Sequence, residues 1–220
     1  MDDKRWLAPL TGVLFIVMVF IGFAVGGEPP DTDEGAEAIV EWYRDNEGSV
    51  FTGAIIQGLA AAVFLFFAGV LRTALREGPG ARGTLAAVSF AGAIVFATGI
   101  AIDGTISFAL AEEADTEGFD PVAMQALLGL WSNDWLPFAV GILTFMLATG
   151  LAILRTGVLP RWLGWLAIAI AIIAGTPIGF VAFFGAGLFV LVVSVMLTMR
   201  ERAAMTGTSP PSPPPPPAAA

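Results

Sequence analysis

Three polar residues, Gln57, Asp103 and Asp134, are the side chains of this sequence that are best suited to bind a ligand. Asp103 lies inside a long apolar run, where a carboxylate is costly to bury and is therefore a functional candidate. Gln57 lies early in another apolar run, and Asp134 immediately precedes a third. With Thr105 and Ser107 they could line a shallow pocket for an ion or a solute. The alternative is that they are interface residues that only hydrogen-bond to neighbouring helices.

The sequence lacks most residues that catalysis or cofactor binding requires. It contains no histidine and no cysteine, which excludes Ser-His and Cys-His nucleophiles, thiol redox chemistry, the usual zinc sites and haem held by histidine or thiolate. It also contains no phosphate loop of the GxxxxGK[ST] form. We therefore expect no catalytic residues, no metal and no cofactor, and we do not expect an enzyme. A membrane enzyme that uses carboxylates alone is the least favoured alternative.

The composition predicts that these polar residues are held by a membrane domain. Of the 220 residues, 56% are hydrophobic and 13% are charged, whereas a soluble domain carries about 25% charged residues. The mean hydropathy is +0.81. Because a bilayer core about 30 Å thick takes roughly 20 helical residues per crossing, the length fits one compact membrane domain with short connections.

Six apolar stretches predict an all-α, polytopic bundle of six transmembrane helices. The expected spans are residues 7–25, 51–71, 84–106, 136–154, 158–174 and 178–199. The tract 162–199 is too long for one crossing, at roughly 57 Å of helix. We divide it at Gly175-Thr176-Pro177, because glycine permits a turn and proline interrupts the helix. The first stretch is longer than the apolar region of a signal peptide, about 7–15 residues, so we expect it to remain as a span.

The charges of the loops orient the predicted spans. The single lysine and all arginines but one lie before the first span, between the second and third, between the fourth and fifth, and after the sixth; Arg44 alone lies between the first and second. The other loops are acidic, and their carboxylates are Glu28, Asp31, Asp33, Glu34, Glu37, Glu41, Asp45, Glu47, Glu112, Glu113, Asp115, Glu117, Asp120 and Asp134. Since basic loops stay in the cytoplasm, we expect both termini to be cytoplasmic. The basic residues are too dispersed to bind nucleic acid.

The acidic loops contain two short amphipathic segments. Asp31 and Glu34 resemble a capping pair ahead of one helix, whose apolar face would consist of Ala36, Ile39, Val40 and Tyr43. Asp120-Pro121 predicts the start of the other. Each helix either lies on the membrane surface or covers the mouth of the bundle, or else it forms a ligand lid or a partner-binding surface. Asp103 is about 28 Å of helix away from Thr84, which places it near the outer interface.

The chain also shows a faint internal repeat and an unusual tail. Leu71-Arg72-Thr73 ends the second predicted span and Leu154-Arg155-Thr156 ends the fourth, which suggests a duplicated hairpin followed by a plainer third one. Residues 1–202 form the expected membrane domain. Residues 203–220 are rich in proline and predict a disordered cytoplasmic tail.

Two stretches carry a family resemblance: Ile55-Ile56-Gln57-Gly58-Leu59, which continues into Phe64-Leu65-Phe66-Phe67 and Leu71-Arg72, and Leu159-Pro160-Arg161-Trp162-Leu163-Gly164-Trp165. In them the chain resembles uncharacterised multi-pass membrane proteins of actinobacteria, of the domain-of-unknown-function type. The resemblance extends to about Met199. It implies no activity and assigns no functional residues.

The sequence therefore favours a non-enzymatic integral protein of the bacterial plasma membrane, with a structural, accessory or partner-binding role. Its expected partners are membrane lipids and either another protein or a second copy of the chain. The rival hypothesis is a small transporter or channel that uses the outer polar cluster of Gln57, Asp103 and Asp134.

Overall fold

The computed structural model describes residues 2–77 and 83–205, and within these ranges every regular element is helical. The elements, in chain order, are the 3-10 segment η1 (Asp2–Leu10) and the α-helices α1 (Thr11–Gly26), α2 (Ala36–Asp45), α3 (Glu47–Glu77), α4 (Thr84–Ala114), α5 (Pro121–Trp131), α6 (Trp135–Thr156), α7 (Arg161–Ala174) and α8 (Phe180–Met205). The predicted all-α class is confirmed.

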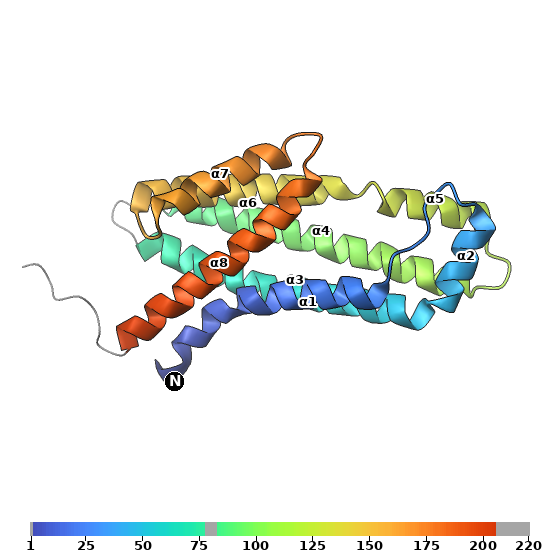
Figure 1. Ribbon diagram of the computed structural model, residues 1–220, viewed down its shortest axis with the longest axis horizontal. Coiled ribbons are helices and arrows are strands. Elements are labelled where there is room, and N and C mark those ends of the chain that lie inside the picture. The colour runs from blue at the N-terminus through green and yellow to red at the C-terminus, as the bar shows by residue number, and fades with distance from the viewer. Residues whose placement is uncertain (1, 78–82, 206–220) are drawn as a thin grey trace, which may run out of the picture.

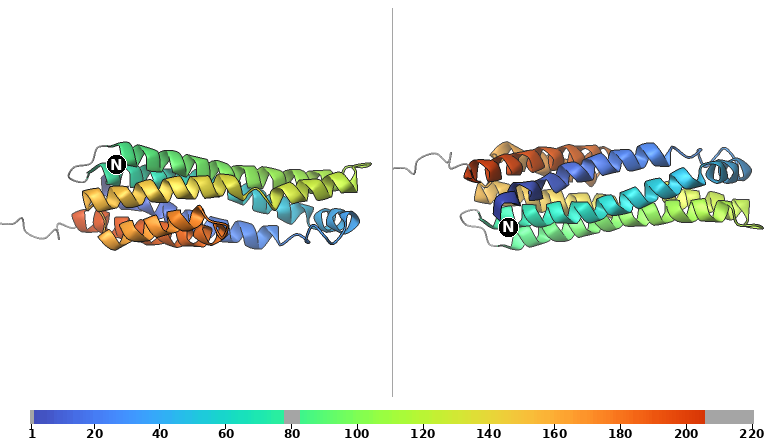
Figure 2. Two further views of the ribbon diagram at one scale, coloured as in Figure 1. Left: turned by 90° about the horizontal axis from the view of Figure 1, so that it is seen from above. Right: turned by 90° about the horizontal axis from the view of Figure 1, so that it is seen from below.

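The long helices form an elongated bundle. α1 packs along α3, α3 along α4, α4 along α6, and α6 along α7. α8 crosses this layer obliquely and contacts η1, α1 and α7 (Figure 1). The end of α8 and the start of η1 lie at one end of the molecule, whereas α2 and α5 lie at the opposite end (Figure 2).

Five helical segments are long and apolar enough to cross a membrane. They are Trp6–Gly26, Glu47–Glu77, Thr84–Ala114, Pro121–Thr156 and Phe180–Met205. α7 has only 14 residues, fewer than the roughly 20 of an ordinary crossing. The predicted break at Gly175-Thr176-Pro177 is confirmed, since α7 ends at Ala174 and α8 begins at Phe180. α7 itself begins at Arg161, because residues 157–160 form the turn after α6.

Glycines set the closest helix crossings in the bundle. A Cβ on Gly141 of α6 would lie 2.5 Å from the backbone nitrogen of Phe96, and one on Gly92 of α4 would lie 2.4 Å from that of Phe145. α1 and α3 meet in the same way, where a Cβ on Gly53 would lie 2.8 Å from the carbonyl oxygen of Gly22. Such close approach is how membrane helices gain packing energy.

Phenylalanines fill the core of the bundle. Phe64, Phe67, Phe145 and Phe189 are completely or almost completely buried, whereas Phe66 is 71% exposed on the outside. Because α4 and α6 approach so closely, the buried hydroxyls of Ser89 and Thr149 lie 2.7 Å apart and form a hydrogen bond.

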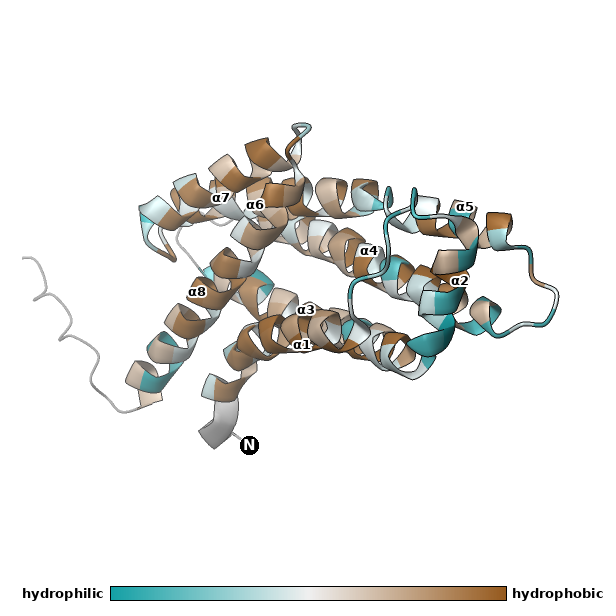
Figure 3. Ribbon diagram, turned by 45° about the vertical axis from the view of Figure 1, so that its right-hand side comes forward, coloured by the Kyte–Doolittle hydropathy of each residue, from teal (hydrophilic) through white to brown (hydrophobic). Residues whose placement is uncertain are grey.

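A second, smaller core lies beyond the bundle, and we call this region the cap. The cap consists of α2, α5 and the ends of α3 and α4 that they cover, and its buried residues are Ile39, Tyr43, Val50, Leu110, Ala111, Ala114, Met124 and Leu128. Figure 3 shows the polar surface of α2 and the adjoining loops against the apolar bundle. The cap thus carries the acidic segments.

The sequence predicted the start of α5 correctly but not the start of α2. The Asp120 side chain accepts a hydrogen bond from the Val122 backbone nitrogen at 2.9 Å, which confirms the predicted cap of α5. The predicted cap of α2 was wrong. Its N-cap is Gly35, with φ of 101°, and Glu34 instead accepts from the Asp31 backbone nitrogen in the preceding turn.

The end of the molecule opposite the cap carries most of the described basic residues, whereas Arg44 lies in the cap and donates to the Ala114 carbonyl oxygen at 3.0 Å. Arg200 donates to the Val158 carbonyl oxygen at 2.7 Å and so ties α8 to the α6–α7 turn. The Arg202 guanidinium lies 3.9 Å above the ring of Trp6. Because α8 continues to Met205, helix extends three residues past the predicted domain boundary at residue 202. The rest of the predicted disordered tail, 206–220, lies outside the described residues.

The helix order follows the predicted repeat. α1, α2 and α3 form one unit of long helix, cap helix and returning long helix, and α4, α5 and α6 form a second. In each unit the two long helices pack against each other, and α2 contacts α5 in the cap. α7 and α8 form the third hairpin, which has no cap helix among the described residues.

Candidate functional site

The structure brings the three predicted site residues together. Gln57 from α3, Asp103 from α4 and Asp134 from the turn before α6 line one cavity of about 780 Å³, which we call the membrane cavity. Its walls come from α1, α3, α4, α6 and α8. Three separate elements therefore contribute polar groups to one end of an otherwise apolar space.

The packing of α4 against α6 positions these carboxylates. Gly92, Phe96 and Gly99 precede Asp103 on one face of α4, and all three are buried. A Cβ on Gly99 would lie 3.3 Å from the Cβ of Pro137, so the start of α6 lies directly against this face. Asp103 follows Gly99 by one helical turn and Asp134 precedes Pro137, which brings both acids to the same place.

The polar groups around Asp103 are incompletely paired. The carboxylates of Asp103 and Asp134 are close enough to repel each other, and the indole N–H of Trp131 is close enough to Asp103 to interact favourably with its carboxylate. Neither the Trp131 indole nitrogen nor one carboxylate oxygen of Asp134 completes a hydrogen bond among the described residues, although both atoms are buried. Buried polar atoms without partners are uncommon in folded proteins and mark a place where a ligand or water fits.

Aromatic side chains form a large part of the lining of the membrane cavity, and they are Phe15, Phe20, Phe23, Phe64, Phe96, Trp135, Phe138, Phe145, Phe180, Phe183 and Phe184. Some of its lining residues are also on the outer surface. Phe20 of α1 is 67% exposed, as is Phe184 of α8, and Leu188 is 60% exposed. The cavity therefore opens sideways between α1 and α8, on the apolar flank of the bundle.

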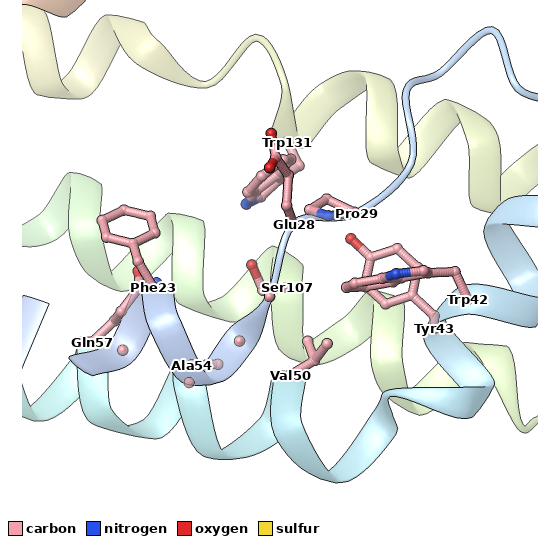
Figure 4. A pocket seen from close by; sticks show the side chains of 14 residues that line it. Phe23, Glu28, Pro29, Trp42, Tyr43, Val50, Ala54, Gln57, Ser107 and Trp131 are labelled. Carbon is pink, nitrogen blue, oxygen red and sulfur yellow. The ribbon is translucent and has the colours of Figure 1, made fainter. Parts of the chain in front are cut away.

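A second cavity of about 430 Å³, the outer cavity, lies between α1 and the cap. Phe23 and Gln57 line both cavities. In Figure 4, Trp42 and Tyr43 of α2 lie on one side of the outer cavity and Gln57 lies on the other. Trp131, Glu28 and Ser107 complete the polar and aromatic wall. The two cavities meet at the junction of the cap and the bundle.

Tyr43 is held as a neutral phenol in this wall. Its ring packs edge-on against Trp42, with 4.9 Å between the ring centroids. Burial raises the pKa of the Tyr43 phenol above its ordinary value of 10, and the nearby charge of Asp103 adds to the effect. The hydroxyl therefore keeps its proton at physiological pH.

The two supporting residues that the sequence suggested, Thr105 and Ser107, lie in different surroundings. Ser107 lines the outer cavity. Thr105 is exposed, and its hydroxyl donates to the Ala101 carbonyl oxygen of its own helix, so it does not join the site. Within the described ranges no group of acids is placed to hold a metal ion.

Sequence reasoning missed the aromatic part of both cavities. Tryptophans near the ends of apolar runs, such as Trp42 and Trp131, are typical of residues that anchor a protein at the membrane interface. Phenylalanines in apolar runs fit packing inside a bundle and contact with lipid equally well. The signal that could have revealed the cavity is the cluster Phe180, Phe183 and Phe184, which puts three large rings at the start of α8.

The profile of a domain of unknown function, DUF4386, matches residues 10–205. The chain belongs to the DUF4386 family. The matched region contains the eight described α-helices and the residues that line both cavities, so it covers the bundle and the cap together. No curated protein and no solved structure shows a significant match to the chain. The family and the apolar helices fit an integral membrane protein.

Proposed function

We propose that this DUF4386 protein is a non-enzymatic, ligand-binding accessory protein of the bacterial plasma membrane. It crosses the membrane six times, with both termini in the cytoplasm. The basic end of the molecule supports this orientation, because short basic segments remain cytoplasmic. α7 forms the fifth crossing. It is the shortest of the six, since its 14 residues give about 21 Å of helix. One lysine beside nine arginines supports a GC-rich host such as an actinobacterium.

The membrane cavity carries the binding proposal. It joins polar groups from three elements to an aromatic space that opens between α1 and α8. On that flank the exposed residues are apolar and face the lipid chains. We infer that the cavity accepts the apolar chain of an amphiphile from the outer leaflet, with the polar end directed toward the cap, past Gln57, Asp103 and Asp134.

Packing in the basic half of the bundle argues against the transporter hypothesis. A conducted ion needs polar partners along its path. An ion moving from Asp103 toward the basic end would have to pass Phe64, Phe67 and Phe145. These side chains are buried, and the ring of Phe64 contacts the other two. A ligand that enters from the side needs no such path.

The topology is tested with a reporter that is active only in the cytoplasm. Fusions after Arg202 or within residues 76–82 are expected to be active. Fusions within residues 34–47 or 113–120 are expected to be silent. Activity from either acidic loop would overturn the orientation.

The binding role is tested with purified protein in nanodiscs and radiolabelled dodecanol as a neutral single-chain probe. Saturable binding above that of empty nanodiscs is expected, and Gly187→Leu should remove it, since Gly187 lines the cavity. Gly58→Leu is the matched control, because no atom lies within 4 Å of a Cβ there. Absence of saturable binding to the folded wild type would refute the role. Ion or solute flux in vesicles that is lost in Asp103→Asn would instead establish a transporter.

A further inference from the structure

We infer that the outer cavity binds an organic cation, the ammonium headgroup of a single-chain amphiphile whose tail lies in the membrane cavity. This inference rests on the proposed binding role and specifies the class of ligand. It is carried by the aromatic and acidic composition of the outer cavity and by its connection to the membrane cavity.

The aromatic residues provide the first part of the argument. Trp42, Tyr43, Trp131 and Phe23 line the outer cavity from three different helices (Figure 4). The faces of aromatic rings attract cations, and cages of tryptophan and tyrosine are a common way to hold quaternary ammonium groups. Trp42 and Tyr43 are fixed against each other edge-on, so their positions are already set before a ligand arrives. Such preorganisation favours affinity.

The charges select a cation over an anion. Glu28 lines the outer cavity, and Asp103 and Asp134 line the polar end of the membrane cavity. The described lining of both cavities contains no lysine or arginine. The cap around them carries the acidic loops, whose combined field raises the local concentration of cations. An anionic headgroup would meet the Glu28 carboxylate and no positively charged side chain in this lining.

The connection between the cavities identifies an amphiphile instead of a small free cation. Phe23 and Gln57 belong to both linings. A headgroup among Trp42, Tyr43 and Glu28 therefore lies next to a space lined by rings and open to the lipid chains. The Gln57 side chain lies at the boundary, where an amide can serve the polar end of the ligand.

The test uses the full chain in nanodiscs of digalactosyldiacylglycerol, an uncharged lipid that cannot compete as a cation. The probes are radiolabelled dodecyltrimethylammonium, dodecanol and dodecanoate, which share a chain and differ in head charge. The cation is expected to bind at least about tenfold more tightly than dodecanol, as two or three cation–ring contacts imply. Excess tetramethylammonium should weaken the binding of the cation only.

Two substitutions locate the headgroup. Trp42→Leu and, separately, Glu28→Gln should each weaken binding of the cation about tenfold and leave dodecanol binding unchanged. Glu28 is exposed in the loop after α1, so its replacement preserves the cap even if Trp42→Leu does not fold. Trp162→Leu is the control, since Trp162 lies on α7 at the other end and is 55% exposed.

The outcomes separate this inference from the proposed role. Equal affinity for all three probes, or tighter binding of dodecanoate, would overturn the cation site and leave the binding role intact. Failure of every probe to bind saturably would overturn both.

Discussion

The cap and the bundle both bury apolar side chains, but they do so against different surroundings. The outer surface of α2 carries Glu37, Glu41, Arg44 and Asp45, which are exposed, so the cap core is closed off from water. The outer surface of the bundle carries Phe20, Phe66 and Phe180, which are 67–71% exposed. Its core is closed off from lipid chains that are themselves apolar.

This difference determines what holds each region together. In the cap, transfer of apolar surface out of water is the main driving force, at about 25 cal/mol per Å². In the bundle that force is absent between helices, so close packing and hydrogen bonds between helices must supply the stability. Close packing is seen at the glycine crossings of Gly92 and Gly141, and a hydrogen bond between helices joins Ser89 to Thr149. The two cavities lie at the junction between the cap and the bundle.

The largest expected loss of stability comes from a substitution at a glycine crossing of the bundle. Gly141→Leu places a side chain where a Cβ alone would lie 2.5 Å from the Phe96 backbone. Overpacking against backbone is expected to destabilise the protein by more than about 3 kcal/mol. Gly69→Leu, where no atom lies within 4 Å of a Cβ, should be nearly neutral. The yield of monodisperse protein after extraction measures both, and equal yields would contradict packing as the bundle's main support.

A truncation in the cap should have a smaller and strictly local effect. Leu128→Ala removes a side chain that is 1% exposed and should destabilise the cap by about 3 kcal/mol. Hydrogen exchange should then accelerate in α2 and α5 and remain unchanged in the basic-end halves of α4 and α6. Leu130→Ala is the control, since Leu130 is 57% exposed. Faster exchange throughout the bundle would show that cap and bundle fold as one cooperative unit.

The hydrogen bond between α4 and α6 is expected to contribute about 1 kcal/mol. A double-mutant cycle with Ser89→Ala and Thr149→Val measures it through the unfolding equilibrium in mixed micelles. Thr98→Val is the control, because the Thr98 hydroxyl bonds only to the Ile94 carbonyl of its own helix. A coupling energy of zero would mean that the pair is an incidental contact within the glycine crossing.

The smallest expected effect is a pH dependence of the stability of the cap alone. Tyr43 is the single tyrosine of the chain, so phenolate absorbance reports on it alone. Because burial raises its pKa above 10, Tyr43 stabilises the cap below pH 10, and this contribution is lost as the pH rises through the folded-state pKa. The phenolate should therefore appear only above pH 10, together with faster exchange in α2. Ionisation at pH 10 with the cap intact would refute a buried phenol.

Several features of the site were predictable because they depend on local sequence. Asp120-Pro121 specifies the start of α5, since a carboxylate cap followed by proline satisfies the first turn without any tertiary partner. Gly92, Phe96, Gly99 and Asp103 share one face of α4 because residues three or four apart lie on the same side of a helix. The cap of α2 was mispredicted, since Asp31 and Glu34 form their own turn before Gly35.

By itself, the sequence determined that this chain is helical, that its helices are apolar enough for a membrane, and that Gln57, Asp103 and Asp134 are its exceptional polar residues. These properties follow from composition and helical periodicity, which act within about one turn of each residue. Only the tertiary structure decided that α8 diverges from α1 to open the membrane cavity, and that Trp42, Tyr43 and Trp131 form the wall of the outer cavity. Those arrangements depend on the angles at which helices cross, and the angles depend on side chains from several distant segments packing at once.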